Sequence, residues 1–345
     1  MLRLARYLKP YLLLIILTIV LLFVQANADL ALPDYMSKIV NNGIQQGGVE
    51  NAVPKALRKS LMDKLVIFMS SANKSIVLSN YSLLDKNSAD FPAYIKEFPV
   101  LANEPVYVLN SISAAEIALL NPVMGKAFLI VETLQQALAD PAKAAAMGQG
   151  LGFDLSKLPP GIDVFSLLSN LPPTQLATLV STIDQKFTTL GDKMIIQMTV
   201  GAVKAEYSAL GMDTAKLQTN YIIHAGVLML LLSLLSITCT MIVGFLSAKT
   251  AAGASRDIRK YVFQKVESFS NTEFNKFSTA SLITRSTNDV TQIQMVIIMM
   301  MRMVFYAPII GVGGIIRAIG KSANMWWIIA LAVVVLLGLI LVVFS

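Results

Sequence analysis

Histidine and cysteine are nearly absent from this sequence of 345 residues, which contains one of each, His224 and Cys239. A zinc site of the Cys/His type needs three or four such ligands, and a disulfide needs two cysteines, so the chain can form neither alone. The sequence also lacks a GxxxxGK(S/T) phosphate loop, a GxSxG nucleophile elbow and an HExxH pair. We therefore predict no catalytic, metal or cofactor residue in this chain.

Charge is scarce as well, and its scarcity is uneven. Only 14% of the residues are charged, whereas about 25% are charged in soluble domains. Asp29, Arg302 and a His224 that can be neutral are the charged positions inside the apolar runs 11–31, 221–248, 290–316 and 325–344. Since about 20 apolar residues cross a bilayer as a helix, we predict an all-α membrane protein. Its four spans are residues 11–33, 220–248, 290–317 and 325–345.

The distribution of basic residues predicts the orientation of the chain. Residues 1–10 carry three bases, and residues 249–289 carry seven bases against four acids. Residues 34–219 are nearly balanced, with 15 bases and 16 acids. Because positive segments stay in the cytosol, the N-terminus and residues 249–289 are predicted to be cytosolic and residues 34–219 extracytosolic, with the protein in the cell membrane. Arg317 and Lys321 in the short outer link are a minor exception.

A cleavable signal peptide is the alternative interpretation of the N-terminus. Three bases, an apolar stretch and Ala26-Asn27-Ala28 match that pattern. The apolar character nevertheless continues through Leu32 and ends at Pro33, which favours a full-length span.

The segment 34–219 is predicted to be a mainly helical insert. Leu and Ala recur at three- and four-residue spacing in residues 114–139, 164–190 and 194–210. Proline and glycine interrupt the pattern at 140–141, 159–161 and 172–173. The segment carries no binding motif, so a helical cap or spacer is expected, with a specific ligand-binding domain as the alternative.

A polar decapeptide, SLITRSTNDV (residues 281–290), directly precedes the third span. Apolar residues at three- and four-residue spacing in 251–269 predict an amphipathic helix that continues the second span. Ser270 and Glu273 have the spacing of a capping box, and Ser278 or Thr279 can cap the next helix. Two helical arms of about 20 residues would then project on the order of 30 Å into the cytosol. Arg285 and Asp289 are spaced as an i,i+4 pair, which on spacing alone indicates a solvated surface contact.

This region resembles ATP-binding cassette (ABC) exporters of the multidrug type. The loop resembles their first intracellular loop over SAKTAAGASRDIRKYVFQKVESFS and FNKFSTASLITRSTNDVTQIQ. LARYLKPY resembles their cytosolic elbow, DLALPDYMSKIVNNGI the end of their first span, and MRMVFYAPIIGVGGIIRAI their third span. The resemblance covers roughly residues 1–48 and 207–345, and little of the insert. Ala280 stands where many members have Gly.

The resemblance implies a mechanism and a set of site residues. A short transverse helix would dock on a cytosolic nucleotide-binding domain through Thr272, Glu273, Phe274, Asn275, Lys276 and Phe277. Arg285, Asn288 and Asp289 would pin the two arms together. The implied partners are a nucleotide-binding domain holding ATP and Mg²⁺, a second half-transporter that forms a homo- or heterodimer, membrane lipid and a lipophilic substrate. No nucleic acid is expected.

The methionines near the inner end of the third span have two interpretations. Met295, Met299 and Arg302 could line a substrate cavity, since flexible thioethers suit promiscuous surfaces. Ordinary helix packing explains the methionines equally well, and Arg302 could extend to the cytosolic headgroups instead.

Two departures from the exporter pattern keep other functions open. The insert is far longer than the usual link between the first two spans, and two spans and a nucleotide-binding domain are missing, as in a fragment or a truncated product. A four-span permease of the lipoprotein-release or macrolide-pump type would fit the length, and a membrane sensor would fit the first two spans. The permease does not predict the cytosolic arms with this loop motif. Two further spans after the cytosolic helix count against the sensor.

Overall fold

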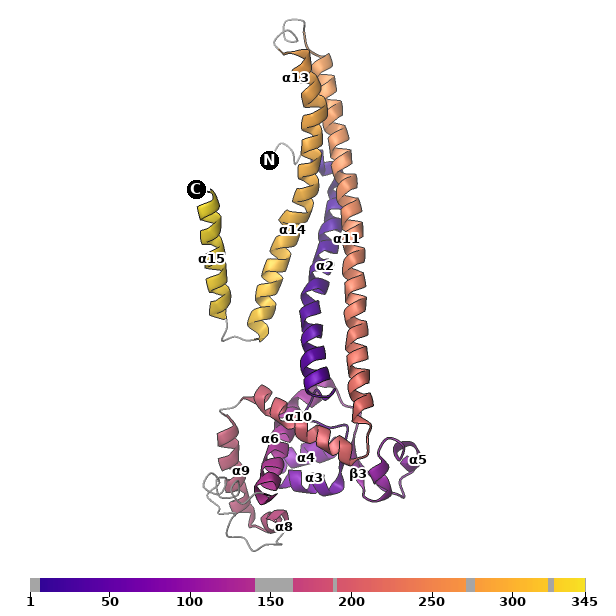
Figure 1. The fold of residues 1–345 in the computed structure, drawn as a ribbon, viewed down its shortest axis with the longest axis vertical. Coiled ribbons are helices and arrows are strands. Elements are labelled where there is room, and N and C mark those ends of the chain that lie inside the picture. Colours follow the sequence, from indigo (N-terminus) through magenta and orange to yellow (C-terminus); the bar gives the residue numbers. More distant parts are fainter. Residues whose placement is uncertain (1–6, 140–163, 189–190, 271–276, 322–325, 345) are drawn as a thin grey trace. The chain divides into compact units, whose positions relative to one another are not determined.

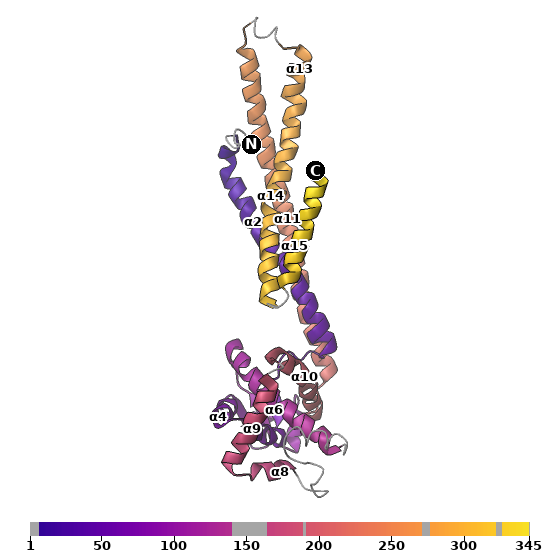
Figure 2. The same cartoon turned by 90° about the vertical axis from the view of Figure 1, so that its left-hand side faces the viewer.

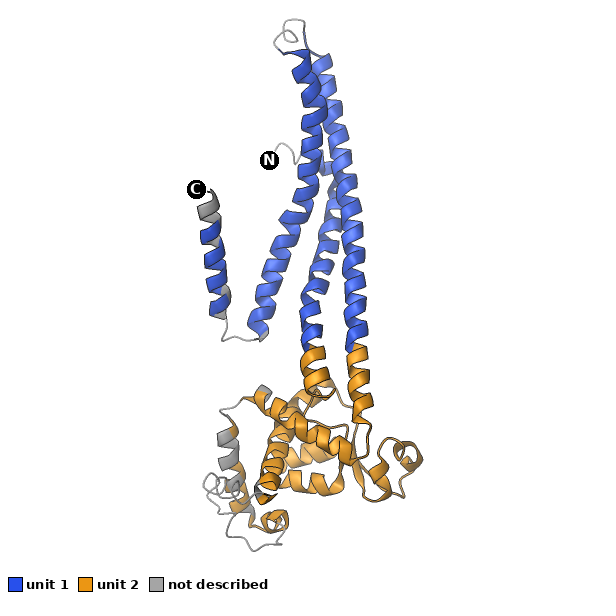
Figure 3. Ribbon diagram, viewed as in Figure 1, with its two compact units in different colours: residues 1–37, 225–345 blue, residues 38–224 orange. Residues whose placement is uncertain are grey.

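The computed structural model describes residues 7–139, 164–188, 191–270, 277–321 and 326–344. It divides into two compact units (Figure 3), which are treated separately below. Unit 1 comprises residues 1–37 and 225–345, and unit 2 comprises residues 38–224. The mainly helical architecture predicted from the sequence is confirmed.

Long apolar helices make up unit 1 (Figures 1 and 2). They are α2 (Leu12–Lys38), α11 (Thr214–Glu267), α14 (Val290–Lys321) and α15 (Trp326–Phe344), of which α2 and α11 extend into unit 2 at one end. A 3-10 turn, Lys9–Tyr11, precedes α2, and the short helix α13 (Thr279–Thr284) precedes α14. Pro33 and Pro308 lie inside α2 and α14, a placement that membrane helices tolerate better than soluble ones.

Four described helical segments are long and apolar enough to cross a membrane: Lys9–Gln45, Ala114–Gln136, Thr214–Glu267 and Thr279–Gly320. Three of them contain predicted spans, whereas Ala114–Gln136 lies in the predicted insert. Half of the most apolar part of this helix is buried within the protein, and Met124 and Phe128 are almost fully buried. An apolar helix whose contacts are already protein side chains has no need of lipid. We therefore assign it to the core of unit 2.

Small residues allow close contacts among α2, α11 and α14. Ala251 and Ala254 of α11 pack with Ile297 and Met301 of α14, and all four are buried. A Cβ atom on Gly253 would lie 2.5 Å from the Tyr11 ring, so only glycine leaves room for that ring.

Two side-chain hydrogen bonds tie the same three helices together. The Tyr11 hydroxyl donates to Asp257 at 2.9 Å, joining the start of α2 to α11. Arg259 of α11 donates to the Thr291 hydroxyl of α14 at 3.1 Å.

Unit 2 contains a small sheet that the sequence did not predict. Its strands are β1 (Ala56–Arg58), β2 (Tyr81–Leu84) and β3 (Val106–Leu109), in the antiparallel order β1-β3-β2, with Tyr107 between Leu57 and Leu83. Strands of three or four residues are too short to show a two-residue alternation, so the expectation of a mainly helical insert did not include them.

Helices surround the sheet. They are α3 (Lys59–Leu65), α4 (Ser71–Ser79), α5 (Phe91–Tyr94), α6 (Ala114–Ala139), α8 (Val164–Ser169), α9 (Pro173–Thr188) and α10 (Asp192–Ala209). The predicted interruption at Pro172 and Pro173 is confirmed, since α8 ends at Ser169 and α9 begins at Pro173. The core of unit 2 contains Phe98, Phe128, Met124 and Leu210, each at most 2% exposed.

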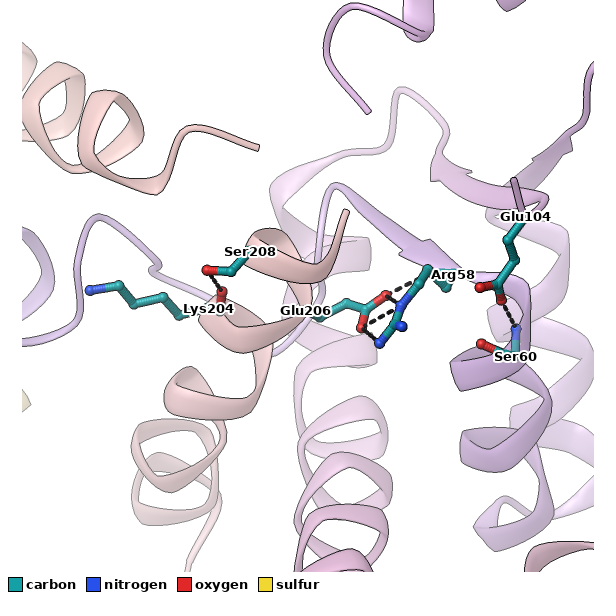
Figure 4. A network of polar contacts seen from close by, with 6 residues as sticks. All are labelled: Arg58, Ser60, Glu104, Lys204, Glu206 and Ser208. Carbon is teal, nitrogen blue, oxygen red and sulfur yellow. Dashed lines mark hydrogen bonds and ion pairs between the residues drawn. The ribbon is translucent and has the colours of Figure 1, made fainter. Parts of the chain in front are cut away.

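A buried carboxylate ties β1 to α10 (Figure 4). Glu206 is 3% exposed and accepts bonds from the backbone N of Arg58 at 2.8 Å and from its Nη2 at 2.8 Å. Glu104 accepts the backbone N of Ser60 at 2.8 Å on the adjoining turn. Since a buried charge is tolerated only when it is paired and hydrogen-bonded, this pair fixes the start of the sheet against the last turns of α10. The carboxylate in turn raises the pKa of Arg58, chiefly through hydrogen bonding.

Candidate functional site

Two arms frame the predicted coupling loop. Helix α11 continues through residues 249–267 without interruption, and α13 begins at Thr279 after Ser278, whose hydroxyl accepts the backbone N of Ser281 at 3.2 Å. Capping by Ser278 is therefore confirmed. Five predicted docking residues lie outside the described residues: Thr272, Glu273, Phe274, Asn275 and Lys276. The predicted capping box of Ser270 and Glu273 includes one of them and therefore also lies partly outside.

Phe277 is the one predicted docking residue within the described part of the chain. Its ring stacks on Phe269 with the ring centres 5.7 Å apart and the planes at 13°. The guanidinium of Arg285 lies 5.8 Å from the centre of the Phe277 ring, within the range of a cation–π contact. Phe277 is still 37% exposed. The aromatic pair of Phe269 and Phe277 thus joins the residues just after α11 to those just before α13 and leaves part of one ring uncovered.

The predicted pinning residues lie in a π-helical turn, Arg285–Asp289. Such turns are rare and often mark functional positions in helices. Within the described residues no ion pair joins Arg285 to Asp289, and Arg285 contacts Phe277 instead. The described bond between the arms is the one from Arg259 to Thr291. A pinning role for Arg285, Asn288 and Asp289 remains a prediction.

Met295, Met299 and Arg302 share one exposed face of α14. Met295 is 61% exposed and Met299 64%, and Arg302 is exposed on the next turn. Ile297 and Met301, on the opposite face, are buried against α11. The described chain therefore leaves the proposed cavity residues uncovered and places them together.

A polar cluster within the predicted spans was not identified from the sequence. The carboxylate of Asp29 in α2 accepts the Ser236 hydroxyl of α11 at 2.5 Å and the Tyr306 hydroxyl of α14 at 2.5 Å. Gln25, one turn earlier in α2, is 8% exposed, and its Oε1 atom has no partner among the described residues. Of these cluster residues, only Asp29 was identified from the sequence, as a charge inside a span. Ser236 and Tyr306 carry no signal until it is known which helix faces meet.

Arg317 anchors the C-terminal end of α14. It donates to the Leu30 carbonyl at 2.9 Å and to Asp34 at 3.3 Å. Its charge is thus compensated by α2, which explains a basic residue on the predicted outer side.

Comparison with known proteins identifies the region that contains this loop. Residues 196–345 match the ABC transporter transmembrane region. The match covers the predicted spans 220–248, 290–317 and 325–345 and the whole loop between the first two of these. With the apolar helices, it supports a multi-pass membrane protein and an ABC exporter type of transmembrane domain in this part of the chain.

Curated relatives agree with the match. Uncharacterized ABC transporter ATP-binding proteins of Mycobacterium tuberculosis and Mycobacterium bovis are each 38% identical over 122 residues, which is 35% of this chain and 21% of the relative. A protein of the same description from Bacillus subtilis is 37% identical over 112 residues, or 32% of this chain and 20% of the relative. The chain thus spans about a fifth of the length of the relatives it matches. No solved structure matches the chain.

Proposed function

We propose that this chain is part of the membrane domain of an ATP-driven exporter that moves a lipophilic molecule across the cell membrane. The observation that carries the proposal is the match of residues 196–345 to the ABC transporter transmembrane region, since it includes the loop with the predicted docking motif. The relatives' printed names describe ATP-binding proteins, which supports a nucleotide-binding domain as the partner. A second half-transporter would complete the membrane domain as a homo- or heterodimer.

In this proposal the chain binds no nucleotide itself. ATP and Mg²⁺ would be held by the nucleotide-binding domain, because the sequence has no phosphate loop. The two arms would act as rigid levers. Packed side chains and the bond from Arg259 to Thr291 join α11 to α14, so a displacement of residues 272–277 would move both helices together. Closure of two nucleotide domains would thereby switch the spans from inward-open to outward-open.

The four-span permease accounts for a large outer segment after the first span, but it does not account for the family match across the loop. The exporter accounts for the match and places the insert on the outer side as an added cap. We propose that the insert shapes access to the outer face, with residues 34–219 extracytosolic.

Truncation of the two phenylalanines of the predicted docking motif tests the proposal. In the full-length protein that carries the nucleotide-binding domain, Phe274→Ala with Phe277→Ala should abolish ATP-dependent uptake of a lipophilic dye into inverted vesicles. ATP hydrolysis should persist, because the catalytic residues lie in another domain.

The matched control is Phe263→Ala. Phe263 is a phenylalanine of the α11 arm that is 68% exposed and lies outside the docking motif, so its loss should leave uptake unchanged. Equal uptake in the double variant and the control would contradict the docking role. Absence of any ATP-dependent uptake or ATP hydrolysis in the native protein would contradict the proposed function itself.

A further inference from the structure

Asp29 forms no ion pair with a basic side chain of the described chain. Its two carboxylate oxygens accept only hydroxyl groups, from Ser236 and Tyr306. Arg317, a base bound to the same helix, directs its donors to the Asn27 and Leu30 carbonyls and to Asp34. An ionisable residue inside a membrane span usually faces the interior of the bundle and has a partner. Here the hydroxyl donors orient the carboxylate but supply no positive charge.

Gln25, next to Asp29, has a buried acceptor atom that lacks a hydrogen-bond donor among the described residues. Residues four apart on a helix share a face, so Gln25 and Asp29 lie one above the other on α2. The Oε1 atom of Gln25 is enclosed and has no donor among the described residues. Its amide neighbours the Tyr306 hydroxyl, and that hydroxyl donates to Asp29. Buried acceptors are normally paired, so one donor is missing from this cluster.

We propose that Asp29 binds the protonated amine of a lipophilic molecule. An N–H group of the ammonium takes the place of the Tyr306 hydroxyl on Asp29, and the hydroxyl then donates to Oε1 of Gln25. This exchange gives Asp29 a positively charged partner and gives Oε1 of Gln25 a hydrogen-bond donor. A quaternary ammonium carries the charge without an N–H, and an alcohol carries a donor without the charge, so neither can complete the exchange. That this amine is also a transported substrate rests on the proposed function.

The face of α14 that leads away from Tyr306 suits the apolar part of such a molecule. Met299 precedes Tyr306 by seven residues and Met295 by eleven, which places all three on one side of the helix. Both methionines are exposed in the described chain. Arg302 lies on the same side, and its charge would oppose a bound cation. A native Arg302 therefore weakens the site, and its removal should strengthen binding.

Equilibrium binding of radiolabelled n-octylamine tests the site without requiring transport. The protein is reconstituted in nanodiscs and binding is read by scintillation proximity. Asp29→Asn should weaken binding about tenfold or more, as expected for loss of a hydrogen bond to a charged partner. Asp63→Asn is the matched control, because Asp63 is an exposed carboxylate paired with Lys59 in unit 2. Equal binding by both variants, or none by the native protein, would overturn the proposal.

Further measurements separate this site from simple charge attraction. Octyltrimethylammonium should bind about as weakly to the native protein as n-octylamine does to the Asp29→Asn variant, and Arg302→Gln should tighten octylamine binding. Should Asp29→Asn fail to fold, Gln25→Leu replaces it. Gln25→Leu removes the acceptor that gains a donor on binding, so it should weaken amine binding several-fold while the empty protein melts higher. Tight binding of the quaternary ion would contradict the exchange. Amine binding without ATP-dependent transport would sustain the site and contradict only the exporter.

Discussion

Burial changes the pKa of two tyrosine hydroxyls in unit 2, those of Tyr207 and Tyr81. Tyr207 is 4% exposed and its hydroxyl accepts the backbone N of Lys55 at 2.9 Å. Burial raises the pKa of Tyr207 to about 12, because the phenolate form loses its hydration, and the bond from Lys55 offsets only part of this shift. Burial also raises the pKa of Tyr81, whose hydroxyl donates to the Pro54 carbonyl at 2.8 Å.

These shifts predict an alkaline loss of stability. A group whose folded pKa lies above its unfolded value of about 10 stabilises the fold fully below that pH, and its contribution disappears as pH rises toward 12. Ionisation of Tyr207 should therefore lower the free energy of unfolding of the native protein by roughly 2–3 kcal/mol as the pH rises from about 10 to above 12. Tyr207→Phe should flatten the alkaline decline in unfolding temperature followed by circular dichroism. At neutral pH it should cost about 1 kcal/mol, because the backbone N of Lys55 loses its acceptor.

Tyr107→Phe is the control for this measurement. Tyr107 lies in the middle of β3 and is partly exposed. Removing its hydroxyl should leave the neutral-pH melting temperature unchanged. An alkaline decline as steep in Tyr207→Phe as in the native protein would show that ionisation of this phenol does not limit stability.

At the scale of elements, the sequence predicts helices much better than it predicts their contacts. The spans are long uninterrupted apolar runs, and α6 is long enough for apolar periodicity to define it. The strands β1 to β3 are too short for such a signal, and Pro172-Pro173 was correctly predicted to interrupt a helix. The cluster of Asp29, Ser236 and Tyr306 depends on three helix faces that meet only in the folded chain. Likewise, the contact of Arg285 with Phe277 replaced the ion pair with Asp289 that spacing alone suggested.

The contact of Tyr11, in the turn directly before α2, with α11 gives a prediction at this scale. A Cβ atom at position 253 would lie 2.5 Å from the Tyr11 ring, and the hydroxyl of that ring is held by Asp257. Gly253→Val should therefore force the helices apart and destabilise unit 1 by about 1–3 kcal/mol, the usual cost of overpacking. The loss is measured as a lower midpoint of thermal unfolding in detergent.

Gly244→Val in the same helix isolates the effect of the contact. A Cβ atom at position 244 meets nothing within 4 Å, so this substitution changes the helix residue without creating a clash. Both valines carry the same intrinsic helix preference. Equal midpoints for the two variants would show that α2 and α11 are not closely packed at Gly253.

For the whole molecule, the decisive property is the membrane topology, that is, which segments lie on which side of the membrane. The basic residues of 1–10 and 249–289 predict a cytosolic location for both segments and an outer location for the insert. The chain offers a simple test because its one cysteine, Cys239, is buried in α11. Replacing Cys239 by Ser leaves a background in which single cysteines can be introduced at exposed positions.

Two such positions give opposite expectations. Lys86 is exposed in unit 2 and Lys260 is exposed on the α11 arm. In intact cells a membrane-impermeant maleimide should label Lys86→Cys and should leave Lys260→Cys unlabelled. After permeabilisation both should react. Labelling of Lys260→Cys in intact cells would place the arms on the outer side, where no nucleotide-binding domain could reach residues 272–277. The exporter mechanism proposed above requires the opposite result.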